Sequence, residues 1–191
     1  MDASRIVRAA RVRACATVTE LSRRSAVPET VIDAIESGAV DPSYETINLL
    51  LSRSRHRLIV LPTVRSDAAE IGALVRALLL SGDESGAFRC LIQLSDNLVA
   101  ERGLIRGALT LEAPEPTGSP VHDAALAGIV EYRLGQEGLP SPDWVAESWR
   151  RLAVPEVLPY GRYTMAVDPE DVPGPLLAHG VLVDRVSLDS V

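Results

Sequence analysis

The chain has 191 residues, 19 arginines and no lysine, and its net charge at neutral pH is −7. Hydrophobic residues make up 47% and charged residues 24%, values typical of a globular protein and not of a disordered chain. No apolar run approaches the roughly 18 residues that a membrane-spanning helix needs. Cys15 and Cys90 are too few and too far apart for a metal motif, so we expect a cytoplasmic protein with two reduced thiols and no membrane partner.

Charge is distributed unevenly along the chain. Residues 1–65 contain 10 arginines and 7 carboxylates, a balance of +3, whereas residues 66–191 contain 9 arginines and 19 carboxylates, a balance of −10. A basic head on an acidic body is typical of a nucleic-acid-binding domain joined to a domain with another role. We therefore predict a DNA-binding domain at 1–57, a connector at 58–65 and a C-terminal module at 66–191.

Residues 17–38 contain two short helical patterns separated by a tight break. A threonine can cap the first helix, Pro28 suits the start of the second, and Gly38 suits its end. Two short helices in this arrangement indicate a helix-turn-helix. The apolar positions at helical spacing are Leu21, Val27, Ile32 and Ile35, and the candidate caps are Thr17 and Thr19.

From Ile6 to Leu61 the chain resembles the phage-repressor-like (Xre or Cro-like) helix-turn-helix family. The resemblance implies a bundle of four or five helices, with residues 28–36 as the recognition helix and a structural ion pair between Arg11 and Glu36. The matching residues are Val7, Ala10, Arg11, Leu21, Ser22, Ala26, Val27, Pro28, Ile32, Ile35, Glu36, Gly38, Pro42, Thr46 and Ile47.

The same resemblance predicts which side chains contact DNA. Side chains of the recognition helix would face base edges, and nearby arginines would reach phosphates. The predicted DNA-binding residues are Arg13, Thr19, Arg23, Arg24, Glu29, Thr30, Val31, Asp33 and Ala34. An alternative stays open, because Val18 stands where the family carries a phosphate-contacting glutamine and two carboxylates lie on the reading face. The chain could then be a protein-interaction module with a vestigial helix-turn-helix.

The connector combines a basic cluster with an apolar run. Residues 58–64 have the composition of a β-strand, and Pro62 suits an edge position. We expect this strand to pair with its twofold mate and give a homodimer. The preceding Arg53, Arg55, His56 and Arg57 could touch phosphate or form a solvated loop.

The C-terminal module is predicted to be rich in helices, with minor β-structure. Helical spacing predicts an antiparallel pair at 67–81 and 87–101 and a further helix at 122–135. The composition predicts a loop at 113–120, a turn and short helix at 138–152 and a strand at 181–183. Residues 187–191 are expected to form a last helical turn or a loose end. The expected fold class is therefore mainly α, with a helix-turn-helix bundle, a short strand and an α-rich C-terminal module.

The sequence contains no catalytic signature. His56, His122 and His179 have no partner at metal-ligand spacing, and we interpret them as structural or surface residues. Asp168, Glu170 and Asp171 could bind a cation or form a solvated loop. We predict no enzyme activity, no catalytic residue, no metal and no cofactor.

The body also resembles the C-terminal part of actinobacterial Xre regulators. Those proteins are often encoded beside a toxin gene, commonly a nucleotidyltransferase-like one. The resemblance implies an antitoxin and autorepressor that binds a palindromic DNA operator as a dimer and neutralises a partner toxin. A ligand-sensing repressor is another alternative, in which Trp144, Trp149, Tyr160 and Tyr163 line a pocket.

Overall fold

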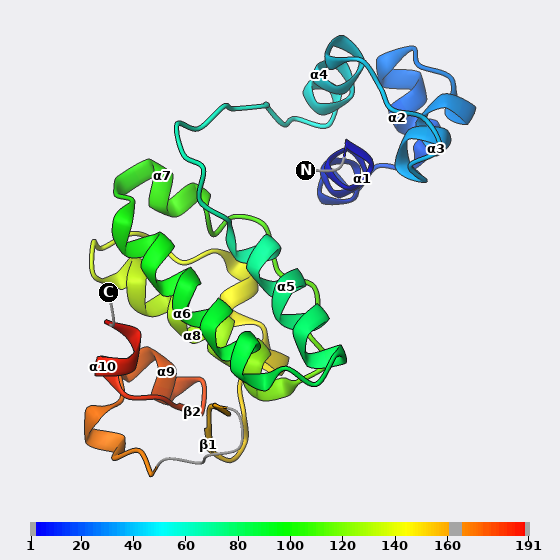
Figure 1. The fold of residues 1–191 in the computed structure, drawn as a ribbon. Coiled ribbons are helices and arrows are strands. Elements are labelled where there is room, and N and C mark those ends of the chain that lie inside the picture. Colours follow the sequence, from blue (N-terminus) through cyan, green and yellow to red (C-terminus); the bar gives the residue numbers. More distant parts are fainter. Residues whose placement is uncertain (1–2, 161–165, 190–191) are drawn as a thin grey trace. The chain divides into compact units, whose positions relative to one another are not determined.

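The computed structural model describes residues 3–160 and 166–189, which are mainly helical (Figure 1). The chain divides into two compact units, residues 1–61 and 62–191. Within the described residues, the one sheet consists of two parallel strands of two residues each. The expectation of a mainly α chain with minor β-structure is confirmed.

Unit 1 is a small helical bundle around one apolar core. Its helices are α1 (Ala3–Arg13), α2 (Val18–Ser25), α3 (Glu29–Glu36) and α4 (Tyr44–Arg53). Helix α1 packs on α3 and α4, and α2 packs on α3 and α4. The bundle forms because each helix turns one apolar stripe inward. The core residues are Val7, Leu21, Ile32, Ile35 and Leu50, with Val18 and Val27 partly buried beside them.

Helix ends in unit 1 follow ordinary capping chemistry. Of the two candidate threonines, Thr17 caps α2, because its hydroxyl accepts a hydrogen bond from the Glu20 N–H at 3.1 Å. Ser43 caps α4 in the same way through the Thr46 N–H. Gly38 follows α3 with a φ of 77°, a left-handed conformation that favours glycine. These features mark the starts of α2 and α4 and the end of α3.

Unit 2 is built around α8 (Pro120–Gly135), in which every residue from Val121 to Val130 is buried. Helices α5 and α6 pack on each other and on α8, and α9 packs on α8 as well. The other elements are α5 (Ala68–Leu80), α6 (Glu84–Ala100), α7 (Gly103–Ala108), η1 (Asp143–Ala146), η2 (Ser148–Arg150), β1 (Glu156–Val157), η3 (Pro169–Asp171), α9 (Gly174–Ala178), β2 (Val181–Leu182) and α10 (Arg185–Leu188).

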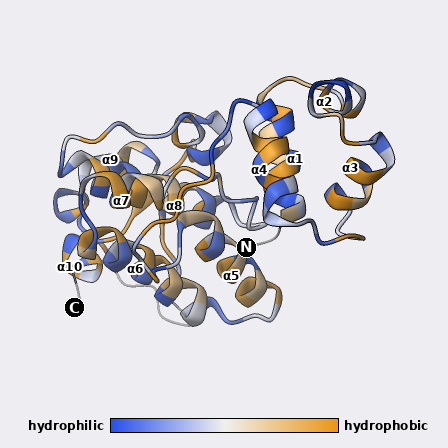
Figure 2. Cartoon of the chain, turned by 90° about the horizontal axis from the view of Figure 1, so that it is seen from above, coloured by the Kyte–Doolittle hydropathy of each residue, from blue (hydrophilic) through white to orange (hydrophobic). Residues whose placement is uncertain are grey.

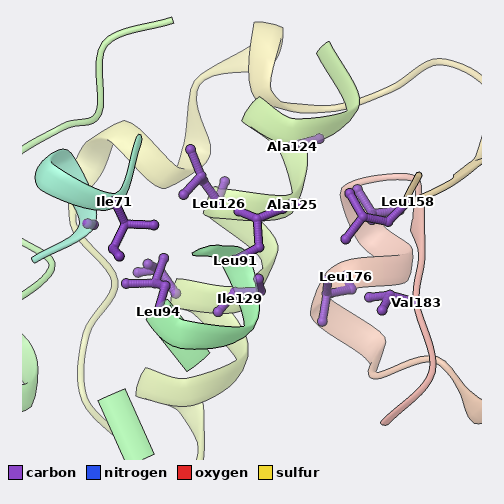
Figure 3. Packing of buried hydrophobic residues seen from close by; sticks show 14 of the residues in the cluster. Ile71, Leu91, Leu94, Ala124, Ala125, Leu126, Ile129, Leu158, Leu176 and Val183 are labelled. Atoms are coloured by element: carbon purple, nitrogen blue, oxygen red, sulfur yellow. The ribbon is translucent and has the colours of Figure 1, made fainter. Parts of the chain in front are cut away.

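Figure 3 shows how the core of unit 2 is layered. Ala125 and Ile129 of α8 lie between two groups of apolar side chains. Helix α9 approaches α8 closely at Gly128, where an added Cβ would lie 3.1 Å from the Leu176 Cα. The first group contains Ile71, Leu91 and Leu94, and the second contains Leu158, Leu176 and Val183.

Buried arginines join distant segments of unit 2. Arg133 of α8 donates to the Ser95 hydroxyl on α6 and to the Leu188 carbonyl on α10, at 2.8 and 2.7 Å. Arg106 donates to the Arg133 carbonyl at 3.0 Å. Arg150 donates to the Pro114 carbonyl at 2.6 Å, and its guanidinium lies 4.7 and 4.0 Å from the ring centroids of the neighbouring tryptophans. These contacts tie loops and short helices to α6 and α8.

Three sequence predictions differ from the structure. Residues 58–64 form no strand, because within one chain no other segment pairs with them. The short helix expected within 138–152 is replaced by the 3₁₀ turns η1 and η2, in which Trp144 and Arg150 donate to the distant carbonyls of Thr110 and Pro114. The last helical turn begins at Arg185 instead of Ser187, because the Asp184 carboxylate caps it, and residues 190–191 lie outside the described part.

Candidate nucleic-acid interface

A charged fork holds α3 against α1. Arg11 Nε and Nη2 each donate to one carboxylate oxygen of Glu36 at 2.7 Å, and Arg11 Nη1 donates to the Ala16 carbonyl at 3.0 Å. The Arg11 and Glu36 side chains are 15% and 9% exposed. The hydrogen bonds to Glu36 raise the pKa of Arg11. This bidentate arrangement fixes both the position and the rotation of α3.

The break between α2 and α3 is formed by Ser25 and Ala26. The buried Ser25 hydroxyl donates to the Leu21 carbonyl at 2.7 Å and accepts from the Val27 N–H at 3.2 Å. Ala26 has a φ of 60°, a left-handed conformation that is strained for any residue with a Cβ. The Ser25 contacts could not be predicted, because a serine at the end of a helix has several common roles.

The predicted DNA-binding residues lie on the surface of unit 1. Ile32 and Ile35 turn one side of α3 into the core, which leaves the rest of the helix to solvent. Ala34 differs from the other predicted residues, since it is half-buried. The exposed members of the set are Arg13, Thr19, Arg23, Arg24, Glu29, Thr30, Val31 and Asp33.

Several of these side chains contact one another or a nearby carboxylate. The Thr19 hydroxyl at the start of α2 donates to the Glu29 carboxylate at the start of α3, at 3.1 Å. Arg24 forms a hydrogen-bonded ion pair with Glu20, and Arg23 lies 4.0 Å from the same carboxylate. These contacts lower the effective charge of the arginines on α2. The two pairs with Glu20 lie within α2, at i,i+3 and i,i+4 spacing, whereas the Thr19–Glu29 hydrogen bond joins two helices and has no local signal in the sequence.

In unit 2, the candidate ligand-binding aromatics differ in burial and in partners. Trp144 is buried and its indole N–H donates to the Thr110 carbonyl at 2.8 Å, whereas Trp149 is 43% exposed. Tyr160 makes an edge contact with Phe88, with ring centroids 4.8 Å apart. Tyr163 lies outside the described residues.

The histidines of unit 2 have structural partners. The ring nitrogens of His179 lie 2.7 Å from the Arg150 carbonyl oxygen and 2.8 Å from a Glu131 carboxylate oxygen. His122 Nδ1 lies 2.8 Å from the Ser119 hydroxyl, and burial lowers the pKa of this imidazole. In unit 1, the His56 ring contacts the Ser54 carbonyl.

The remaining candidates show no metal-binding geometry. Among the described residues, no group of three histidine, cysteine or carboxylate side chains could hold a metal ion, and this includes Asp168, Glu170 and Asp171. Burial raises the pKa of the Cys90 thiol, which disfavours the reactive thiolate. No helix in the described ranges is both long and apolar enough to cross a membrane.

Comparison with known proteins returns no relative: no family model, no curated protein and no solved structure matches this chain. The function must therefore be argued from the geometry of the chain itself.

Proposed function

We propose that this chain is a DNA-binding transcriptional regulator in which α2 and α3 form a helix-turn-helix and α3 enters the major groove. The observation that carries the proposal is the way α3 is held. Ile32, Ile35 and the Arg11–Glu36 fork fix one side of the helix, while its opposite side carries exposed polar residues. A rigid helix with an exposed polar side is what reading base edges requires.

In this proposal, residues at the start of α3 read the sequence and arginines position the protein. Thr30 and Val31 are exposed, and a threonine hydroxyl and an apolar side chain suit base edges and the thymine methyl group. Arg13, Arg23 and Arg24 would contact phosphates, which carry no sequence information. Phosphates would compete with Glu20 for the two arginines of α2.

We further propose that the protein acts as a homodimer on a palindromic operator. The unpaired connector 58–64 supports this, because Ile59, Val60 and Val64 are 68%, 91% and 104% exposed in the single chain. Pairing of two such connectors would bury these side chains and bring two copies of α3 to successive turns of the groove.

The first test is binding of the purified protein to its own promoter DNA and to a scrambled duplex across a salt series. A preference of about 10³ or more for the promoter would support a sequence-reading regulator. Arg24→Glu should weaken binding to both duplexes and lower the salt dependence, since it removes a phosphate contact. Thr30→Ala should instead change the preference between duplexes.

Two results would contradict the proposal. Unchanged affinity and salt dependence of the Arg24→Glu variant would mean that α2 does not lie along the DNA backbone. No binding of the unmodified protein at low salt would favour the alternative, a protein-interaction module with a vestigial helix-turn-helix. The contacts of Thr19 with Glu29 and of Arg24 with Glu20 favour that alternative, because they use polar groups that DNA would otherwise contact.

For unit 2 we propose binding of a partner protein, as an antitoxin binds its toxin. Its support is the charge balance of −10 over residues 66–191 together with exposed apolar side chains. Figure 2 shows α5 as largely hydrophobic, and Leu74 and Leu80 of this helix are 49% and 81% exposed. Co-expression with the product of the neighbouring gene tests this proposal. A stable complex that is lost when residues 66–191 are removed would support it. Separate elution of the two proteins would contradict it.

A further inference from the structure

A stretch without carboxylates surrounds the end of α4. Between Glu45 and Asp67 the sequence contains four arginines and no acidic residue. Arg65 lies 3.5 Å from Glu101, so one of the four has an ionic partner. The other three, together with His56, form what we name the 53–57 cluster: Arg53, Arg55, His56 and Arg57.

The three arginines of the 53–57 cluster are exposed cations without a carboxylate partner in the described chain. Each is exposed, and no ion pair joins any of them to a described aspartate or glutamate. The two arginines of α2 differ, because Arg23 and Arg24 share Glu20. The cluster therefore supplies positive charge that no neighbour neutralises.

Arg55 takes a left-handed conformation in the turn that ends α4, where glycine would be favoured. Helix α4 ends at Arg53, and the chain then turns back so that the His56 N–H donates to the Leu51 carbonyl at 2.8 Å. This turn requires a left-handed residue, and Arg55 has a φ of 61°. Glycine adopts this conformation without steric cost, so an arginine here costs folding free energy. The turn is closed by backbone atoms, so any use of the exposed Arg55 side chain lies outside it.

The acidic character of α3 gives a reason for DNA contacts by the arginines of the 53–57 cluster. Glu29 and Asp33 lie on the proposed reading side, where they repel phosphates. A helix of this charge needs phosphate contacts from other parts of the molecule. The negative C-terminal end of the α4 dipole would favour a positive charge at Arg53, which lies in the last turn of the helix. It would not account for the charges of Arg55 and Arg57, which lie beyond the helix.

We propose that the 53–57 cluster is a second DNA contact, which binds backbone phosphates independently of sequence beside the site that α3 reads. This inference rests on the proposed function, since it assumes that unit 1 binds duplex DNA. The ligand chemistry is that of the duplex backbone, a regular row of phosphates, and the guanidinium fork suits phosphate oxygens.

The test replaces the three arginines of the cluster by glutamine in the full chain and measures binding to promoter and scrambled duplexes across a salt series. Each phosphate contact contributes about 0.9 to the slope of log affinity against log salt, so we expect the slope to fall by about 2.7. Between 50 and 200 mM salt, the unmodified protein should then lose about 40-fold more affinity than the variant. The loss should be equal on both duplexes, because phosphates carry no sequence information.

The matched control is the same triple change to glutamine at Arg76, Arg89 and Arg102, which are exposed on unit 2. It alters net charge equally and should leave the slope unchanged. A second variant, Arg55→Gly, separates binding from folding: it should raise the thermal midpoint and still lower the slope by about 0.9.

Two results would overturn the inference, and they differ in what they say of the proposed function. In the first, the cluster variant has the same salt slope as the control variant while the unmodified protein prefers its promoter over the scrambled duplex. The cluster is then a solvated turn, and the proposed function stands. If the unmodified protein binds neither duplex at low salt, both fail.

Discussion

At the scale of single residues, the fork between Arg11 and Glu36 is the contact most open to test. Glu36→Ala would leave a guanidinium with little exposure and no carboxylate, which should cost roughly 3 kcal/mol of unfolding free energy in unit 1. Replacing both partners by apolar residues, as Arg11→Met with Glu36→Leu, should cost much less, because no charge is left unpaired. Denaturation followed by circular dichroism measures both variants.

The control for this prediction lies in the other unit. Trp144 and Trp149 both belong to unit 2, so the unfolding midpoint seen by tryptophan fluorescence should not move in either variant. If Glu36→Ala and the double variant had the same stability, the unpaired Arg11 guanidinium would carry no penalty and the prediction would be wrong.

A second prediction at this scale concerns the turn between α2 and α3. Ala26 is left-handed, so Ala26→Gly should relieve steric strain and stabilise unit 1 by roughly 0.5–1 kcal/mol after the entropy cost of glycine. The same change at Ala9, exposed inside α1, should destabilise by about 1 kcal/mol. Thermal melts that showed the same sign for both variants would contradict this explanation.

At the scale of elements, the sequence predicted helices well where local signals repeat. Apolar spacing and caps placed α2, α3, α5, α6 and α8 within a few residues of their observed bounds. The connector 58–64 forms no strand in the single chain, because strand formation depends on a partner and not on composition alone, and its pairing with a second copy stays a prediction. The 3₁₀ turns η1 and η2 were missed, since they depend on tertiary contacts of Trp144 and Arg150.

The candidate site shows the same division between local and distant information. Exposure of Thr30 and Val31 follows from the periodicity of α3, so the sequence could predict it. The hydrogen bond from Thr19 to Glu29 joins two helices and has no local signal. The burial of three arginines of unit 2 was also missed, because burial of a charged side chain is decided by partners far away in the sequence. These residues are Arg106, Arg133 and Arg150.

At the scale of the whole molecule, the two units should respond differently to acid. His122 in unit 2 is buried, its Nε2 has no hydrogen-bond partner, and desolvation holds its pKa below the ordinary value of 6.5. Asp123 and Glu84 oppose this shift but do not reverse it. A depressed folded-state pKa means that the unfolded chain binds the proton more readily, so His122 stabilises unit 2 above about pH 6.5 and this contribution is lost as the pH falls.

The variant His122→Asn tests this sign, because an asparagine can keep the contact with the Ser119 hydroxyl and does not titrate. Between pH 7 and 5, the unfolding free energy of unit 2, followed by Trp144 and Trp149 fluorescence, should fall less steeply in this variant than in the unmodified protein. The equivalent change at His56 in unit 1 should leave the tryptophan-detected profile unchanged. If the unfolding free energy fell equally with pH in the His122 variant and in the unmodified protein, the acid sensitivity of unit 2 would come from its carboxylates. The His122 imidazole would then have no part in it.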